Sequence, residues 1–132
     1  MSSLPSEVHM KRFSLLALVL LANVTAQAST KLDTMTECVG YLSSMPADAG
    51  KNFDYYEQQY QRVYDLYREE MKDNGYNDVE LGLNFATYWS VYGTSRPLLK
   101  MVDLVQSTDT TALQSAAVQM YNNRNCETVL SK

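Results

Sequence analysis

The chain has 132 residues and a net charge of −4 at pH 7, and its length suits a single domain. This acidic balance argues against nucleic acid and anionic membrane surfaces as partners, because both repel a negatively charged protein. The one histidine, His9, precedes the export cleavage site predicted below. We therefore expect a processed domain with neither a Ser-His-Asp nor a Cys-His catalytic centre, and with no His-ligated metal.

The N-terminus has the pattern of a secretory signal peptide. Met10-Lys11-Arg12 gives a basic start, residues 13–22 are almost wholly apolar, and Ala26-Gln27-Ala28 places small residues where a signal peptidase cleaves. The alternative is a membrane anchor, but the apolar run is shorter than the roughly 20 residues of a spanning helix. We predict a signal peptide over residues 1–28 and a periplasmic or secreted domain over residues 29–132, with 9 basic and 14 acidic residues.

Two cysteines fall in the predicted domain, Cys38 near its start and Cys126 near its end. In an oxidising compartment an isolated pair usually forms a disulfide, although two buried free thiols are the alternative. A Cys-x-x-Cys motif is missing from the sequence, which argues against disulfide-exchange chemistry. The predicted bridge closes almost the whole domain into a loop, and such a loop stabilises a fold by roughly 4–5 kcal/mol.

Apolar residues recur at helical spacing along the predicted domain, with no strand-like alternation. The first predicted helix begins at the capping box Thr34-x-x-Glu37 and ends at Pro46. The second is the longest, from Asn52 to Asp73, and Asn74-Gly75 ends it. Its apolar stripe consists of Phe53, Tyr56, Tyr60, Val63, Tyr64, Tyr67 and Met71.

Further helices follow this turn. Asn77-x-x-Glu80 resembles a second capping box, and Gly93 is expected to end the helix that it begins. Ser95-Arg96-Pro97 begins the fourth helix, Thr108-Asp109 caps the fifth, and residues 126–130 add a short terminal turn. Short connections favour antiparallel neighbours. The predicted fold is all-α, a compact antiparallel bundle of about five helices with one disulfide.

Tyrosine is unusually frequent, and all ten copies fall within the predicted domain. Those on the stripe of the longest helix are expected to fill the core with their hydroxyls at its rim, the alternative being an aromatic recognition surface. Tyr41, Tyr55 and Tyr76 are better candidates for exposed contacts with a partner. Trp89 is expected in the core, the alternative being stacking on a sugar or a peptide.

Acidic residues on the longest helix are the clearest candidates for acid–base catalysis. The five candidates include Glu70 and Asp73, and all five are predicted on the solvated face or at the end of this helix, where no burial raises a carboxyl pKa. Glu57, Asp65 and Glu69 lie on its polar face. A Ser95–Lys100 dyad lies in no recognisable motif, and the turn over residues 73–78 lacks the ligand pattern of an EF-hand. We therefore predict no enzyme activity, no metal and no cofactor, and we assign these three carboxylates to partner binding.

Around the first cysteine the chain reads Cys38-Val39-Gly40-Tyr41-Leu42. Together with the leader and the helical patterning, this stretch resembles small periplasmic immunity proteins that neutralise peptidoglycan amidases delivered by type VI secretion. Members of that group often carry a Cys-x-Gly-Tyr-like stretch on an early helix and a later cysteine. The resemblance ends after Leu42, where Ser43-Ser44 replaces a glycine region. It implies an inhibitor of another protein and transfers no inhibitory residue.

The sequence thus predicts a non-catalytic exported domain that binds a protein, as an immunity protein or inhibitor that occludes the basic cleft of a toxin or hydrolase. The alternative is a periplasmic acid-stress chaperone, a class that is also small, helical and bridged by one disulfide. The predicted domain has carboxylates but no histidine, so the charge of such a chaperone would change at pH ~4, where protonation of the carboxylates would expose apolar helix faces. The partner, the oligomeric state, and a small apolar ligand between helices stay open.

Overall fold

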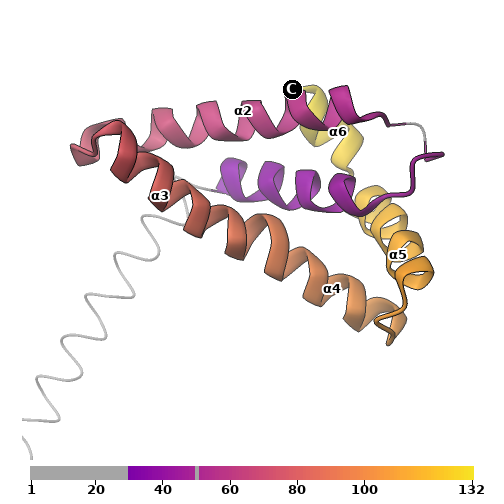
Figure 1. Ribbon diagram of the computed structural model, residues 1–132. Helices are drawn as coiled ribbons and strands as arrows, with labels where there is room; N and C mark the ends of the chain where they lie inside the picture. Colours follow the sequence, from indigo (N-terminus) through magenta and orange to yellow (C-terminus); the bar gives the residue numbers. More distant parts are fainter. Residues whose placement is uncertain (1–29, 50) are drawn as a thin grey trace, which may run out of the picture. The chain divides into compact units, whose positions relative to one another are not determined.

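Five helices joined by short turns make up the described part of the computed structural model, which covers residues 30–49 and 51–132 (Figure 1). No described residue is in a β-strand, so the all-α prediction is confirmed. The predicted leader, residues 1–28, lies outside the described residues. None of the described helices is long and apolar enough to cross a membrane. The first helix covers residues 30–44, and α2 follows it (Phe53–Met71). The third helix consists of α3 (Asp78–Tyr88), a π-helical segment (Trp89–Ser95) and α4 (Arg96–Val105), which are continuous. The last two helices are α5 (Thr110–Asn123) and α6 (Cys126–Ser131).

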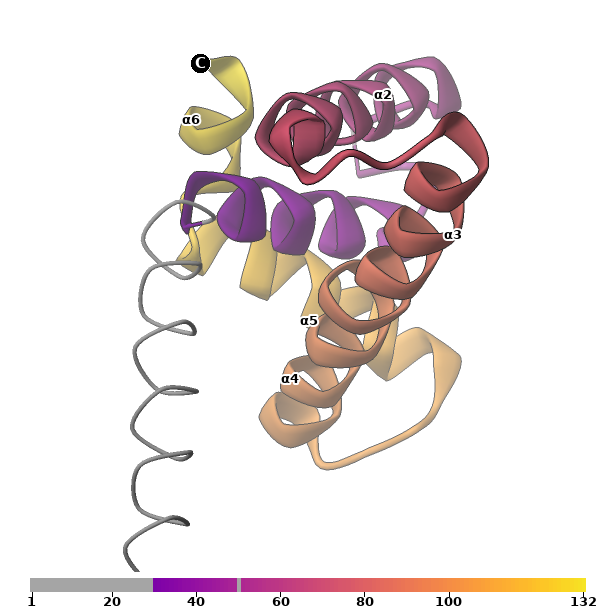
Figure 2. The same ribbon diagram turned by 90° about the vertical axis from the view of Figure 1, so that its left-hand side faces the viewer.

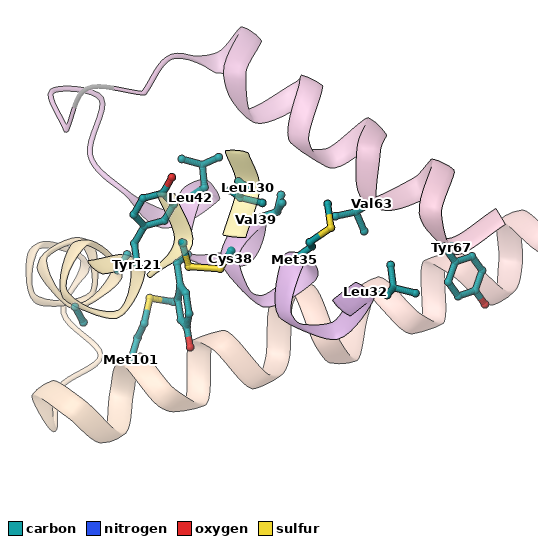
Figure 3. Packing of buried hydrophobic residues seen from close by; sticks show 14 of the residues in the cluster. Leu32, Met35, Cys38, Val39, Leu42, Val63, Tyr67, Met101, Tyr121 and Leu130 are labelled. Atoms are coloured by element: carbon teal, nitrogen blue, oxygen red, sulfur yellow. A yellow bond between two sulfur atoms is a disulfide. The ribbon is translucent and has the colours of Figure 1, made fainter. Parts of the chain in front are cut away.

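The helix over residues 30–44 is the centre of the domain. From Met35 to Leu42 every residue except Glu37 is buried, which is the property of a helix with neighbours on all sides. Figure 2 shows it between α2, α3 and α5, and in Figure 1 α2 runs antiparallel both to it and to α3–α4. Its apolar side chains form the middle of the core together with residues from α2, α4, α5 and α6 (Figure 3).

This central helix does not begin at the predicted capping box. It is already formed at residue 30, so Thr34 lies inside it and the prediction is wrong. The reason is that Leu32 is fully buried and extends the apolar stripe one turn before Thr34. Glu37 consequently has no capping role, and its carboxylate is used in contacts between helices that are described below.

The end of α2 follows the predicted Asn74-Gly75 signal, and its start is capped by Asn52, the residue at which the helix is predicted to begin. The side chain of Asn52 accepts a hydrogen bond from the Tyr55 backbone N–H at 2.8 Å, which caps the first turn. At the other end a short 3-10 turn (Lys72–Asn74) leads to Gly75, whose φ of 74° lies in the left-handed region that glycine adopts without strain. These caps confirm the predicted helix to within two residues at each end.

The capping box of α3 is also confirmed, because the side chains and backbones of Asn77 and Glu80 satisfy each other. Gly93, however, does not end the helix, which continues as the π-helical segment into α4. The prediction is wrong because Gly93 serves packing instead: a Cβ on Gly40 would lie 2.4 Å from the Gly93 carbonyl oxygen. The central helix and the π-helical segment therefore meet at two glycines.

The predicted disulfide joins Cys38 of the central helix to Cys126 at the start of α6 (Figure 3). Their Cα atoms are 5.4 Å apart across a sequence separation of 88 residues, and both side chains are fully buried. The bridge holds the C-terminal helix against the middle of the core. The predicted cap of α5 is confirmed too, since Asp109 accepts a hydrogen bond from the Ala112 backbone N–H at 3.3 Å.

Candidate binding surface

Tyr41, predicted as an exposed partner contact, is fully buried. Its hydroxyl donates a hydrogen bond to Glu37 Oε2 at 2.9 Å. Burial, followed by this hydrogen bond and the Glu37 charge, raises the pKa of the Tyr41 phenol. The prediction is wrong because it assumed an exposed face on a helix that neighbours enclose. Tyr41 is therefore a core residue and is excluded from the candidate surface.

The Cys-x-Gly-Tyr stretch has a packing role at each position. Cys38 forms the disulfide, Val39 is fully buried, Gly40 allows close approach to the π-helical segment, and Tyr41 fills the core. None of these four residues is exposed in the described structure. In this chain the stretch explains how the core is built, and it offers no direct contact to a partner.

Glu37 is the centre of a polar clamp between helices. Arg124 donates to both carboxylate oxygens, at 2.7 Å from Nε and 3.2 Å from Nη2, and Lys100 from α4 donates as well. Partial burial alone would raise the pKa of Glu37, but hydrogen bonds from Arg124, Lys100 and Tyr41 outweigh it and lower the pKa to about 2. The clamp therefore joins the central helix to α4 and to the end of α5.

Glu70, predicted to lie in solvent without a raised pKa, is in the opposite situation to Glu37, and the prediction is wrong because neighbouring helices partly cover it. Its Oε2 is buried and has no hydrogen-bond partner among the described residues. Burial, and then the charge of Asp33, raise the pKa of Glu70. Tyr88 on α3 donates to Asp33 Oδ1 at 2.8 Å and lies 3.1 Å from Thr36 Oγ1, so three helices meet at this cluster. The raised pKa of Glu70 favours its protonated form.

The predicted acidic residues lie on the exposed side of α2, as expected. Glu57, Asp65 and Glu69 are all exposed. Gln61 donates to Asp65 at 3.0 Å, and Lys72 pairs with Glu69 at 2.6 Å in an exposed ion pair that contributes little to stability. Glu57 takes part in no ion pair formed by the described residues, so its charge is the most available of the three.

The two remaining predicted contacts lie at opposite ends of α2. Tyr55 is half-buried in the first turn, where Lys51 Nζ lies 4.6 Å from its ring centroid. Tyr76 is 41% exposed and follows the last turn. A helix of this length spans roughly 28 Å. The predicted partner contacts are therefore spread along the length of α2 and do not form a single cluster.

Phe53 is the residue that the sequence assigned wrongly to the core. It is 68% exposed at the first position of α2. Its ring lies 6.2 Å from that of Tyr56. We call these two residues the Phe53–Tyr56 ridge, since surface hollows of about 610 and 590 Å³ are each lined by both of them. The sequence signal that could have indicated this exposure is the position of Phe53 in the first turn of the helix.

Aromatic rings connect this ridge to the core. Tyr56 lies 6.2 Å from Tyr60, which meets Trp89 edge to face at 4.7 Å and Phe85 at 5.7 Å. Edge-to-face pairs of this kind contribute roughly 0.5–1.5 kcal/mol each beyond the area that they bury. The tyrosines on the apolar stripe of α2 were expected in the core. This is confirmed for Tyr67, which is buried, and in part for Tyr56, Tyr60 and Tyr64, which are half-buried against the core.

The described surface thus offers aromatic rings beside carboxylates, a combination that binds cations and apolar groups. Within residues 30–49 and 51–132, no three His, Cys, Asp or Glu side chains gather as a metal site. Comparison of the chain with protein-family models, with curated proteins and with solved structures finds no match.

Proposed function

We propose that this protein is a non-catalytic binding domain that occludes a basic cleft on another protein. The observation that carries the proposal is the exposed Phe53 ring four residues from the exposed and unpaired Glu57, at the start of α2. An aromatic side chain that stands in solvent beside a carboxylate is the kind of anchor found at the centre of protein interfaces. Its contact with Tyr56 leaves Phe53 68% exposed, and a binding partner would cover this apolar surface.

The rigidity of α2 supports this proposal. Val63 and Tyr67 are buried on its inner side, and Arg62 donates to the backbone carbonyl of Leu130 on α6. At the helix start, Lys51 pairs with Glu127 of α6 at 3.0 Å. A surface that is fixed before binding loses little conformational entropy when a partner arrives, which favours tight association.

The charge of the chain supports a basic partner. A net charge of −4 attracts a positively charged cleft over long distances and speeds encounter at low salt. The exposed carboxylates of α2 are the natural contact for such a cleft. The Cys38–Cys126 disulfide agrees with an oxidising compartment. The resemblance of residues 38–42 to periplasmic immunity proteins, together with the predicted leader, suggests a peptidoglycan hydrolase toxin as the target of this immunity protein or inhibitor.

Hydrolase toxins encoded beside the gene of this protein provide the test. We expect one of them to bind the purified protein and to lose its hydrolytic activity. Glu57→Lys should weaken binding at least ~tenfold by placing a like charge against the basic cleft. Asp103→Lys on α4 is the matched control, because Asp103 is also exposed and the substitution changes the net charge equally. Absence of a complex with every neighbouring product, or equal effects of the two substitutions, would refute the proposal.

The described carboxylates do not favour the chaperone alternative. The pKa of Glu37 is held at about 2, so the clamp that it forms persists through mild acid. Glu70 has a raised pKa, and its protonation removes a buried charge, which stabilises the fold as the pH falls. Retained helicity and no protection of client proteins at pH ~2.5 would exclude this function, whereas acid-induced opening with client protection would support it.

A further inference from the structure

The Phe53–Tyr56 ridge stands between two hollows at the start of α2. One hollow, of about 610 Å³, lies toward Glu57, Gln58, Tyr60 and Gln61. The other, of about 590 Å³, lies toward Leu42, Met45 and the residues that precede α2. Both volumes lie within the range of surface sites that hold a small ligand or a few side chains. A binding partner can therefore contact the Phe53–Tyr56 ridge from two sides.

Contacts between aromatic rings hold the Phe53–Tyr56 ridge in place. Tyr60 is held by Trp89 and Phe85, and Tyr56 is half-buried against Tyr60, where burial, and then the Tyr60 charge, raise the pKa of its phenol. Phe53 ends this series of contacts with its ring 68% exposed. An apolar surface that is both fixed and exposed stabilises a complex when another apolar group covers it.

The rim of the ridge is negative. Asp54 and Glu57 are exposed, and neither belongs to an ion pair among the described residues. The basic side chain Lys51 lines the second hollow, but it pairs with Glu127, and Arg62 donates to Gln59 and to the Leu130 carbonyl. Two carboxylates beside an open aromatic ring therefore remain to be neutralised by a ligand.

We propose that this ridge binds a peptide segment in which an apolar side chain stands next to arginine or lysine. The apolar side chain covers Phe53 and enters a hollow beside Tyr56, and the cation reaches Glu57 or Asp54. Arginine suits the site better than lysine, because its planar group pairs with a carboxylate through two hydrogen bonds and stacks on an aromatic face. This inference rests on the proposed function only for the identity of the protein that supplies the segment.

Short peptides test this inference directly. The probe is acetyl-Arg-Trp-Arg-amide, titrated into the full ¹⁵N-labelled protein while amide resonances are followed by NMR. We expect saturable shifts centred on Phe53, Tyr56 and Glu57, with a dissociation constant of about 1 mM, as suits a three-residue ligand. Acetyl-Glu-Trp-Glu-amide and acetyl-Arg-Gly-Arg-amide should each bind at least ~tenfold more weakly, because one lacks the cation and the other the apolar group.

A matched pair of variants locates the site. Phe53→Ser should weaken binding of the probe at least ~tenfold, whereas Leu99→Ser on α4 should leave it unchanged. Leu99 is the appropriate control because its side chain is also 68% exposed. Equal binding of the acidic peptide, no saturation, or no effect of Phe53→Ser would overturn the inference. Preferential binding of chitotriose at the same resonances would overturn it too, since the site would then recognise saccharides.

This experiment separates the inference from the proposed function. If Glu57→Lys abolishes binding of a hydrolase toxin but Phe53→Ser leaves that binding intact, the protein is an inhibitor and the ridge is not its anchor. If the cationic peptide binds at the ridge but no toxin binds the protein, the ridge recognises its segment and the inhibitor role is refuted.

Discussion

The central helix and the start of α2 each carry an aromatic ring four residues from a carboxylate. In the central helix these are Tyr41 and Glu37, which hydrogen-bond to each other inside the domain. In α2 they are Phe53 and Glu57, which both stand in solvent. The same local spacing thus gives an internal clamp in one place and an open surface in the other.

The difference between the two pairs comes from their surroundings. Glu37 receives donors from Lys100 and Arg124, which are 63 and 87 residues away in the sequence. Glu57 has no such donor among the described residues, because its helix is covered on one side only. We therefore expect substitutions in the central helix to change stability and substitutions at the start of α2 to change binding.

Removal of the disulfide should give one of the largest losses of stability on the enclosed side of this comparison. Cys38→Ser with Cys126→Ser should lower the free energy of unfolding by about 4 kcal/mol, because the unfolded chain regains the entropy of a loop that separates residues 88 positions apart. Urea denaturation measures the effect. A loss below ~1 kcal/mol would show that the bridge does not hold the domain together.

Neutralising the clamp should have the next largest effect. Glu37→Gln should lower the free energy of unfolding at pH 7 by about 2 kcal/mol, because two cationic donors lose their acceptor charge. Because the pKa of Glu37 is lowered, its charge stabilises the fold fully at pH values above the ordinary carboxyl pKa of 4.5. This stabilisation is lost as the pH falls toward about 2. The difference between wild type and variant should therefore shrink below pH ~4.5 in urea titrations. A difference that is independent of pH would contradict the assignment.

Glu70 sharpens the comparison, since it is partly enclosed but has no donor for its buried oxygen. Glu70→Gln should raise the free energy of unfolding at pH 7 by about 1 kcal/mol, because it removes a charge that folding disfavours. A raised pKa in the folded state means that the charged form is penalised at neutral pH and that protonation relieves the penalty. The gain should vanish below pH ~4.5, and a destabilised variant at pH 7 would contradict this account.

Phe53→Ser should have the smallest effect on folding. Its ring is 68% exposed, so the free energy of unfolding should change by less than ~0.5 kcal/mol. Phe85→Ala is the contrasting variant, because Phe85 is buried at the centre of the same ring network and its removal should be destabilising by about 3–5 kcal/mol. Comparable losses for the two variants in thermal or urea unfolding would mean that Phe53 belongs to the core.

Much of the fold was predictable because its signals are local. Asn52, the Asn77–Glu80 capping box, Gly75 and Asp109 set helix ends through contacts within a few residues. The disulfide was predictable because the domain has only two cysteines. Periodicity then gave the inner side of α2 and the positions of its exposed carboxylates.

The errors arise where neighbours distant in sequence decide the outcome. Gly93 serves a contact with Gly40, so the helix continues where a local signal indicated an end. Tyr41 is buried because several helices surround it, whereas Phe53 is exposed although it lies on the apolar stripe of α2. Periodicity identifies an apolar stripe but does not show how far the covering helices extend.

One pair of matched substitutions tests the central claim, that the start of α2 binds a partner and the central helix only supports it. Glu57→Gln and Glu37→Gln make the same chemical change, and each variant is measured for toxin affinity and for free energy of unfolding. We predict that Glu57→Gln weakens binding at least ~tenfold with a stability change below ~0.5 kcal/mol, and that Glu37→Gln does the reverse. Loss of affinity in the folded Glu37→Gln protein, with none in Glu57→Gln, would contradict the account.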